Sequence, residues 1–223
     1  MERKDNQTPQ GQSARVLVEF LEVAITSIVF LKGVYPNGKN SITKNEINNS
    51  TLLHISRAFE RRRYMNMVVH RARHPELYEY IHSAVNGLLP FIQKGLVERV
   101  AVIFFKEDKV PIERFVFKLN VNQSYGSKVE QADLEFSLRS FLIKLPVSEP
   151  MTKFLPRNCR WEITAYFRSL PQTSTIKDTE MWIPTDTKQW QQLPVITPIR
   201  SMSSEPLGLQ LYLEHPSLSE PKP

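Results

Sequence analysis

The chain has 223 residues, of which 41% are hydrophobic and 23% charged, a composition typical of one large globular domain. No stretch is apolar enough to span a membrane, residues 1–12 are too polar for a secretory signal, and the single cysteine, Cys159, cannot form an internal disulfide. A reducing compartment, the cytosol or the nucleus, is therefore expected. The net charge is +6, and residues 57–74 carry six arginines against one glutamate, so most of the excess lies there.

The first predicted element is a helix from Ser13, which can cap its start, to about Lys32. The polar residues 1–12 before it are predicted to be disordered. The polar stripe of this helix is narrow, so we expect the helix to be buried over most of its circumference. Gly33 ends the helix, and Pro36 prevents it from resuming. The stripe consists of Arg15, Glu19, Glu22 and Thr26.

Residues 37–56 are rich in Asn, Ser, Thr and Lys without periodicity, which is typical of a surface loop. Residues 59–69 follow and are predicted to form a short edge strand that contains the basic run Arg61-Arg62-Arg63. Charge runs usually keep an edge strand soluble, so a patch that contacts nucleic-acid phosphates is the less favoured interpretation.

A second helix is predicted to begin at Pro75, to kink at Pro90 and to end at Gly95. Residues 97–105 and 112–119 then form a predicted β-hairpin around a polar loop. The first strand of this hairpin is apolar on both faces, which indicates a central strand covered on both sides. The second strand alternates and has one wetter face.

A third helix is predicted over residues 129–145, ended by Pro146, and a third strand over residues 160–168. Three helices and three antiparallel strands indicate a two-layer α+β core over residues 13–168, with the helices packed on one face of the sheet. The other face still needs a cover. We therefore expect residues 169–214 to cross the sheet instead of forming a core of their own.

The sequence contains no phosphate-binding glycine loop and no nucleophile elbow, and Cys159 has no evident base, so no enzymatic activity and no cofactor are predicted. His70 and His74 are four residues apart, but the string HRARH lacks the glutamate of a zinc protease, so no metal site is predicted. Tyr80 lies beside the apolar stripe of the second helix and could be plain core. Trp182 lies in a loop of the tail, where a large aromatic ring must pack or bind.

Seven segments, taken in their order and spacing, resemble the HORMA domain family. They are VEFLEVAITSIVFLKGVYP, FERRRYMN, RHPELYEYI, VPIERFVFKL, LRSFLIKL, NCRWEITAYFRS and LQLYLEH. The resemblance runs from about residue 14 to 214 and is greatest to the branch of non-catalytic subunits of DNA polymerase zeta. The chain departs from the family at about residues 38–57, where roughly twenty residues look inserted, which is long for a loop in a compact domain.

The resemblance implies a HORMA fold in which residues 169–214 form a mobile safety belt, followed by a tail at residues 215–223. The belt would close over a partner peptide that lies along the sheet edge, so that main-chain hydrogen bonds give affinity and closure slows release. Two partners are implied. One is a proline-containing peptide of the catalytic subunit of DNA polymerase zeta, and the other is the C-terminal domain of the translesion deoxycytidyl-transferase scaffold.

The family positions that contact the peptide match Tyr80 and Trp182. A family position at the face through which two HORMA domains pair matches Arg139, so a homodimer is implied. The positions that hold the scaffold domain match Ile196, Gln210 and Tyr212. Gln210 and Tyr212 are two apart on a predicted strand, so they share one face while the leucines beside them face the core.

The sequence therefore predicts a non-enzymatic adaptor, located in the nucleus, that bridges the polymerase catalytic subunit and the transferase scaffold in translesion DNA synthesis. One alternative is a checkpoint or meiotic HORMA adaptor that binds another peptide with the same belt. A second alternative is a nucleic-acid-binding module that uses residues 57–73, although we expect no tight DNA binding by the chain alone and no membrane partner.

Overall fold

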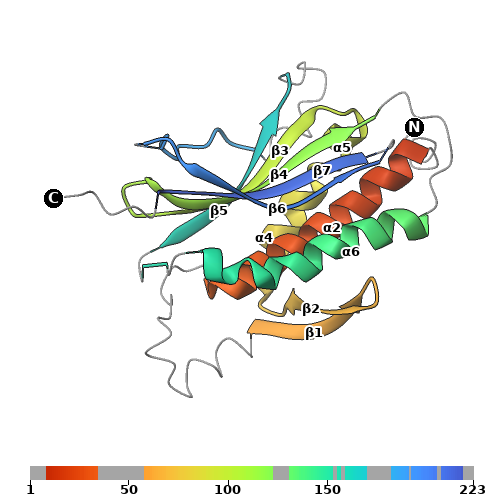
Figure 1. Cartoon of the computed structure of the whole chain (residues 1–223), viewed down its shortest axis with the longest axis horizontal. Coiled ribbons are helices and arrows are strands. Elements are labelled where there is room, and N and C mark those ends of the chain that lie inside the picture. The colour runs from red at the N-terminus through yellow and green to blue at the C-terminus, as the bar shows by residue number, and fades with distance from the viewer. Residues whose placement is uncertain are drawn as a thin grey trace.

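The computed structural model describes residues 9–34, 58–122, 131–152, 155–156, 159–169, 182–190, 192–204 and 207–217. In this part of the chain five antiparallel strands form one sheet, and the helices pack on one of its faces (Figure 1). A separate two-stranded hairpin lies on the far side of the helices from the sheet. The predicted α+β architecture is therefore confirmed.

Helix α2 (Pro9–Lys32) is the central helix and contacts the other three helices. Among its described side chains only Gln12, Arg15 and Glu19 are exposed, as its narrow polar stripe predicts. The helix begins at Pro9, before the predicted cap at Ser13, so residues 9–12 are helical and the prediction of disorder is wrong for them. Proline suits the first helical position because its fixed φ is helical and its missing N–H would have no partner there. Gly33 ends the helix at a φ of 63°.

The sheet has the strand order β5-β3-β4-β7-β6. Its centre is the predicted hairpin, formed by β3 (Val97–Phe105) and β4 (Pro111–Val121). The predicted third strand, β5 (Arg160–Phe167), pairs with the other side of β3. Phe117 and Phe115 face the helices and Val116 faces the opposite side, so both faces of this hairpin are buried.

The second predicted helix is divided into α4 (Pro75–Asn86) and the short α5 (Leu89–Gln93). Pro90 does not kink one continuous helix, because it lies in the first turn of α5, where a missing N–H breaks no intrahelical bond. Gly95 follows α5 at a φ of 67°, which is the left-handed conformation expected after a helix.

The third predicted helix, α6 (Gln131–Val147), does not stop at Pro146 but contains it. The proline lies in the last turn, so only one backbone hydrogen bond is lost there. A single turn of 3₁₀ helix, η2 (Glu149–Met151), follows.

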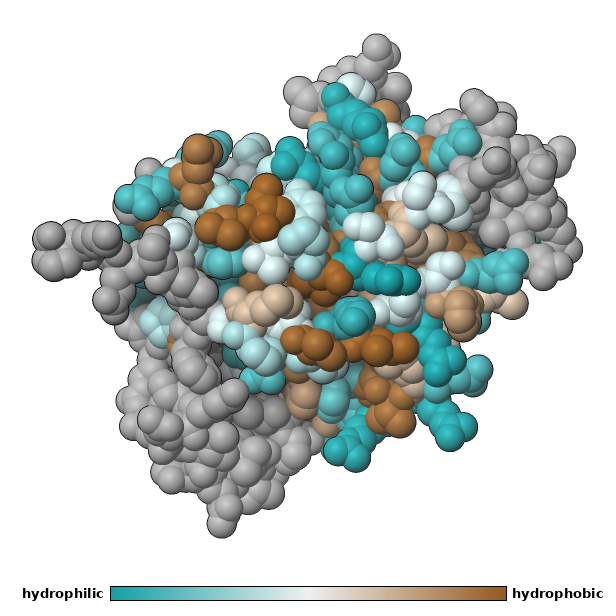
Figure 2. Space-filling model, in the orientation of Figure 1, coloured by the Kyte–Doolittle hydropathy of each residue, from teal (hydrophilic) through white to brown (hydrophobic). Residues whose placement is uncertain are grey.

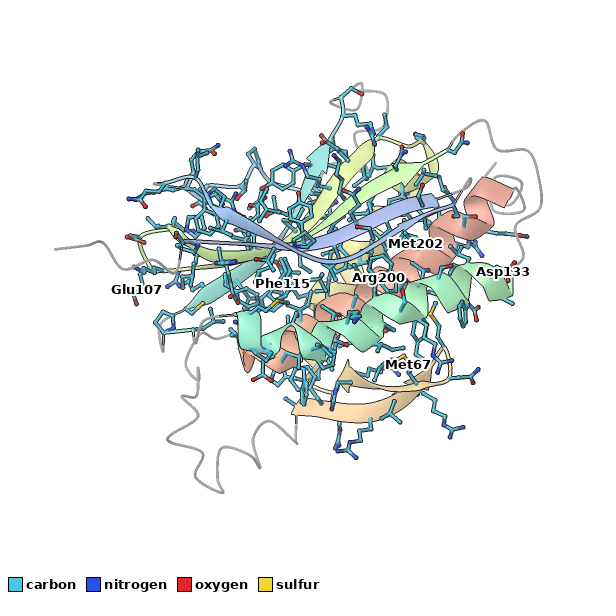
Figure 3. All side chains as sticks on the ribbon, viewed as in Figure 1. Met67, Glu107, Phe115, Asp133, Arg200 and Met202 are labelled. Atoms are coloured by element: carbon cyan, nitrogen blue, oxygen red, sulfur yellow. The ribbon has the colours of Figure 1, made fainter. Side chains whose placement is uncertain are left out.

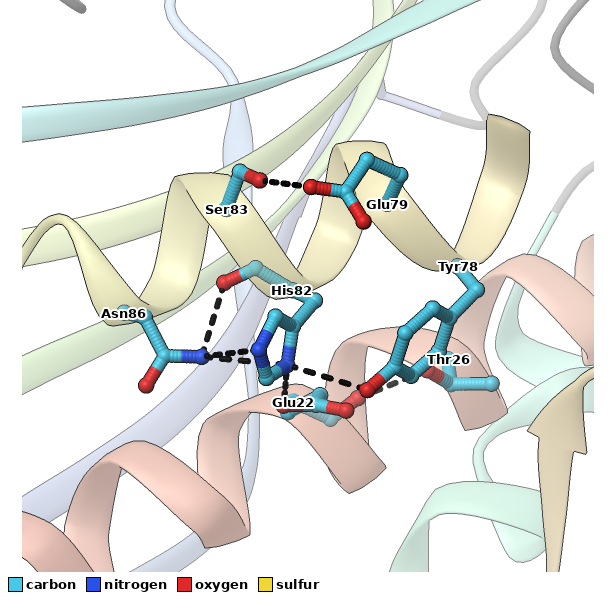
Figure 4. A network of polar contacts seen from close by, with 7 residues as sticks. All are labelled: Glu22, Thr26, Tyr78, Glu79, His82, Ser83 and Asn86. Atoms are coloured by element: carbon cyan, nitrogen blue, oxygen red, sulfur yellow. Dashed lines mark hydrogen bonds and ion pairs between the residues drawn. The ribbon is translucent and has the colours of Figure 1, made fainter. Parts of the chain in front are cut away.

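A polar network joins α4 to α2 (Figure 4). His82 Nδ1 lies 2.9 Å from Glu22 Oε2, and the Asn86 side chain donates to the His82 carbonyl at 3.0 Å. The Tyr78 ring stacks on the His82 ring with centroids 5.1 Å apart. These contacts fix the position of α4, the helix that carries Tyr80.

Residues 59–69 do not form the single edge strand predicted from the sequence. They belong to a hairpin of β1 (Phe59–Tyr64) and β2 (Met67–Ala72), which is separate from the sheet. Met65 and Asn66 turn the chain at φ values of 46° and 57°, the conformation of a two-residue hairpin turn. The hairpin packs against α2 through β2.

The tail divides into two parts. Residues 182–190, called the crossing segment below, begin beside α4, and from Thr185 to Trp190 they run over the sheet face opposite the helices, where they contact residues of β5, β4 and β7. The later described part of the tail does not cross the sheet. It forms β6 (Val195–Ser203) and β7 (Leu207–His215), a hairpin that extends the sheet beside β4.

The predicted inserted loop at residues 38–57 lies outside the described residues, as do residues 170–181 of the predicted belt and the tail from residue 218. Within the described ranges, no helix is both long and apolar enough to cross a membrane.

Candidate functional site

Strand β5 is an outer strand, so one side of its backbone has no strand partner among the described residues. The Ile163 N–H points to this side, because it donates to the Tyr80 hydroxyl (3.0 Å). Alternate residues of a strand direct their backbone groups the same way, so Trp161 and Ala165 also present theirs to this side. We call this side the β5 edge. Such an edge can accept another strand by main-chain hydrogen bonds.

Tyr80 extends from the middle of α4 to the β5 edge. Its ring packs edge-on against Trp161, with centroids 5.3 Å apart. The residue is 41% exposed, yet burial around its hydroxyl raises the pKa of that group above its ordinary value. Tyr80 is therefore not only a core residue, because its hydroxyl already accepts a hydrogen bond from one backbone N–H of the β5 edge.

Trp182 packs against the main core at the end of α4, where Gly87 makes room for its ring. A β-carbon added to Gly87 would lie 3.3 Å from Trp182 Nε1, so a side chain there would push the indole away. Tyr80 and Gly87 are two helical turns apart, which is about 10 Å along the axis. Tyr80 and Trp182 therefore lie along one face of α4.

The crossing segment is tied to β5 by threonine hydroxyls. Thr185 Oγ1 and Thr187 Oγ1 donate to Glu162 Oε1, at 2.6 Å and 2.5 Å. Thr164 of the same strand donates to this oxygen at 3.0 Å. Because Glu162 belongs to the strand whose outer side is the β5 edge, the crossing segment is fastened immediately beside that edge.

A second set of contacts holds the crossing segment over the middle of the sheet. Lys109 Nζ lies 3.0 Å from Asp186 Oδ1, and the Lys109 carbonyl accepts a hydrogen bond from the Lys188 N–H (3.0 Å). The Lys188 carbonyl accepts from Arg114 Nη2 at 3.2 Å. These contacts come from the β3–β4 loop and from β4, so the segment is anchored along its length.

Ile196, Gln210 and Tyr212 lie on one face of the β6–β7 hairpin. Gln210 is exposed and Tyr212 half-buried, and both alternate with buried leucines, as predicted. Ile196 is 59% exposed and pairs with Glu214, the next residue on the same face as Tyr212. Burial, and then the Glu214 carboxylate, raise the pKa of Tyr212 above its ordinary value. The structure therefore brings together the three residues predicted to hold a second partner.

Arg139 lies on α6 among exposed apolar side chains. Phe136 is 75% exposed, Ile143 48% and Val147 63%, and their spacing places them in one stripe along the helix. Apolar surface is scattered over the face in Figure 2, the face on which Figure 1 shows β6 and α6. Arg200 of β6, labelled in Figure 3, donates from Nε to Ser140 of this helix at 3.0 Å. An apolar stripe with a central arginine suits pairing with a protein surface.

Replacing Arg139 with alanine should leave the protein folded but weaken self-association by about tenfold or more, as expected for an interface arginine. Sedimentation velocity over a range of concentrations measures the change. Lys144→Ala, an exposed charge on the same helix, is the matched control and should have little effect. If the unaltered protein and the Arg139 variant both sediment as monomers, α6 is not a pairing face.

The basic run on β1 does not form one continuous surface. Arg61, Arg62 and Arg63 are exposed, but on a strand Arg62 points away from the face of the other two. Arg62 Nε also donates to Glu60 Oε1 at 2.7 Å. The arrangement favours a solvated hairpin over a phosphate-binding patch.

Changing Arg61, Arg62 and Arg63 together to alanine should alter the free energy of unfolding by no more than about 0.5 kcal/mol, because all three are exposed. Partner binding should be unchanged, and neither form should bind duplex DNA tightly at physiological salt. Fluorescence anisotropy with labelled DNA tests this. Strong binding that the triple change abolishes would make the chain a nucleic-acid-binding module.

No group of three or more potential metal ligands occurs among the described residues. His70 stacks on Phe30, with ring centroids 3.5 Å apart, whereas His74 lies at the N-cap position of α4 without a side-chain capping bond. Burial raises the pKa of the Cys159 thiol to about 12, which makes a reactive thiolate unfavourable.

Sequence reasoning missed the residues that fasten the crossing segment. Glu162 was placed only within the predicted strand over residues 160–168, and Thr185 and Thr187 were not singled out. The single feature of the sequence that could have indicated their role is the spacing of the two threonines, which are two residues apart, so that an extended backbone directs both side chains to the same side. Gly87 was also missed, since its close contact with Trp182 spans residues distant in the sequence.

Comparisons with known proteins agree with the fold and the segments described above. The sequence model of the HORMA domain family matches residues 13–178. The chain is 62% identical over 221 residues to the DNA polymerase zeta processivity subunit of Arabidopsis thaliana, covering 99% of this chain and 94% of that protein. It is 29% identical over 209 residues to the mitotic spindle assembly checkpoint protein MAD2B of Homo sapiens, covering 90% of each.

Solved structures share the fold at low sequence identity. A chain in the crystal structure of the mitotic checkpoint complex superposes with a TM-score of 0.69 at 14% identity, over 92% of this chain and 99% of that one. The C. elegans protein HTP-2, bound to HTP-3 closure motif 1, gives a TM-score of 0.64 at 10% identity, over 94% and 88% of the two chains.

Proposed function

Because this chain belongs to the HORMA domain family, we propose that it is a non-enzymatic accessory subunit of DNA polymerase zeta that acts in the nucleus in translesion DNA synthesis. Its similarity to a DNA polymerase zeta processivity subunit over nearly the whole of both chains supports this role. In the proposal, it traps a peptide of the polymerase catalytic subunit and bridges it to the translesion deoxycytidyl-transferase scaffold.

The β5 edge is the observation that carries the proposal. Among the described residues this edge has no strand partner and no bulge interrupts it along Trp161, Ile163 and Ala165, although the Tyr80 hydroxyl accepts from the Ile163 N–H. An extended peptide can add to it as a further strand, with main-chain hydrogen bonds for affinity and side-chain contacts for selectivity. Tyr80 would give one of those contacts, since its hydroxyl already lies on this edge.

The crossing segment would retain the peptide. It begins at Trp182, beside α4, and its threonines bind Glu162 next to the β5 edge. Release of a peptide would require these contacts to break together, which lowers the dissociation rate more than it alters association. The β6–β7 face with Ile196, Gln210 and Tyr212 would bind the transferase scaffold, because an aromatic ring with polar neighbours on an exposed strand suits an interface.

The proposal is tested by blocking the β5 edge without breaking the sheet. Ala165→Pro removes one N–H that points away from β3, and proline is tolerated on an edge strand at such a position. Isothermal titration calorimetry with a synthetic peptide from the polymerase catalytic subunit should then show affinity reduced by about tenfold or more. Ala165→Val keeps the N–H and is the matched control.

Equal peptide affinity in both Ala165 variants, with both folded, would show that the peptide does not use the β5 edge. A second measurement, with peptides from checkpoint and meiotic proteins, separates the proposed role from other roles of HORMA domains. If peptides from checkpoint or meiotic proteins bind at this edge and those of the polymerase do not, the chain is an adaptor for another complex.

A further inference from the structure

A cavity of about 250 Å³ lies between the crossing segment and the sheet, on the face opposite the helices. Val116 and Tyr166 line its floor, and Arg99 and Arg114 line its sides. We propose that this cavity binds a small oxyanion of the phosphate class, such as phosphate or pyrophosphate. The site is separate from the β5 edge and does not depend on the proposed function.

The two arginines reach the cavity from opposite ends. Arg114 on β4 pairs with Ile103, which lies four residues along β3 from Arg99. Between them, Ala101 and Val116 pair directly across the two strands and are both buried. The small alanine side chain leaves room above the sheet, so the two long arginine side chains extend toward a common space.

Each guanidinium group stacks on an aromatic ring. Arg99 Cζ lies 4.8 Å from the centroid of the Tyr166 ring, and Arg114 Cζ lies 5.1 Å from that of Trp190. Stacking holds the plane of a guanidinium group while leaving the N–H groups at its rim available. Both groups are therefore held in place, with Arg114 Nη2 already donating to the Lys188 carbonyl, which reduces the entropy lost when their remaining donors bind an anion.

Both arginines have a buried Nε atom that makes no hydrogen bond in the part of the chain that the structure describes. Glu98 Oε1 lies 3.6 Å from Arg99 Nε, and Glu214 Oε2 lies 3.7 Å from Arg114 Nη1, so both contacts are ion pairs that are too long to be hydrogen bonds. Glu214 Oε2 instead accepts from the Trp190 indole N–H at 3.2 Å. Buried donors without acceptors are unfavourable, so an acceptor in the cavity would be stabilised.

The shape and charge of the cavity select the class of ligand. Its lining carries two arginines against one carboxylate, that of Glu214, while the Glu98 and Glu162 carboxylates contact lining residues from outside it. Guanidinium forks match the paired oxygens of phosphate groups. A peptide strand is too large for a volume of about 250 Å³ roofed by the crossing segment, whereas a compact polyanion fits. The free anion is therefore the occupant we infer.

Anion binding should also stabilise the crossing segment. Thr185, Thr187 and Gln189 of this segment line the cavity, so the complete site exists only while the segment lies across the sheet. A ligand that binds one conformation in preference to another stabilises the conformation that it binds. Phosphate-class anions should therefore slow the opening of residues 182–190.

The site is tested by titrating the full chain with pyrophosphate and with phosphate at constant ionic strength, using calorimetry. Arg99→Gln and Arg114→Gln should each weaken pyrophosphate binding by about tenfold or more, as expected for loss of a charged hydrogen-bond donor. Lys118→Gln is the matched control, because Lys118 is an exposed cation on the same face of β4 but does not line the cavity. Binding by this variant should match that of the unaltered protein.

Hydrogen–deuterium exchange provides a second readout. Pyrophosphate should slow amide exchange in residues 182–190 of the unaltered protein and leave it unchanged in Arg99→Gln. Arg99 makes none of the contacts that hold the crossing segment, so this variant should fold normally even if Arg114→Gln does not. The inference is overturned if pyrophosphate does not bind at millimolar concentration, or if Lys118→Gln loses as much affinity as the two arginine variants.

Discussion

Replacing Glu113 with leucine should lower the free energy of unfolding by about 3–5 kcal/mol, the usual effect of breaking a buried ion pair. Glu113 of β4 pairs with Lys32 at the end of α2, and their side chains are 1% and 5% exposed. Burial lowers the pKa of Lys32, and the Glu113 carboxylate opposes that shift. Without this carboxylate, a buried ammonium loses the charge that offsets its desolvation. Urea unfolding followed by circular dichroism measures the change.

The double variant Lys32→Met with Glu113→Leu is the control for this effect. Two apolar side chains of similar volume often replace a buried pair without loss of stability, so the double variant should recover most of the deficit. If the Glu113 change alone alters the free energy of unfolding by less than about 0.5 kcal/mol, the pair does not hold α2 against the sheet.

The elements with the clearest local patterns were predicted most closely. The bounds of β3 agree with the sequence because a run of apolar residues is enclosed by a glycine before it and a polar loop after it. Errors occurred at the prolines. Pro90 lies in the first turn of a helix and Pro146 in the last turn of another, because the effect of proline depends on which turn of a helix it occupies.

The β1–β2 hairpin was missed because its turn lacks the usual glycine. Met65 and Asn66 both adopt positive φ, and methionine gives no sequence signal for that conformation. The buried pair of Lys32 and Glu113 was missed for a related reason. From the sequence alone, Lys32 is an ordinary charged residue in the last turn of a helix, and its contact with β4 is evident only in the folded structure.

The candidate site was predicted in part. Resemblance to the family singled out Tyr80 and Trp182, whose peptide-binding role stays a prediction, and strand alternation alone placed Gln210 and Tyr212 on one face. The contacts of Glu162 with the threonines of the crossing segment could not be predicted, because they join residues more than twenty positions apart across a sheet face. A local sequence pattern assigns a side chain to one face of a strand, but it does not identify the segment that packs against that face.

The alanine variants of Trp182 and Tyr212 should separate two binding sites on one domain. Trp182→Ala should weaken binding of the catalytic-subunit peptide by about 2–4 kcal/mol, because the Trp182 ring packs beside α4 where the crossing segment begins. Binding of the scaffold domain should be unchanged. Tyr212→Ala should weaken binding of the scaffold domain by about 2 kcal/mol and leave binding of the peptide unchanged. Calorimetry with each partner measures all four affinities. Ile183→Ala is the control, because Ile183 adjoins Trp182 but is 85% exposed.

The separation follows from where the two side chains lie. Trp182 contacts Gly87 of α4, on the side of the β5 edge, whereas Tyr212 lies on β7, with β3 and β4 between its strand and β5. Residues this far apart with no shared partner usually act independently, so the two losses should add in the double variant. If each single variant lost both partners equally while unfolding at the same urea concentration as the control, one shared surface would have to replace the two sites.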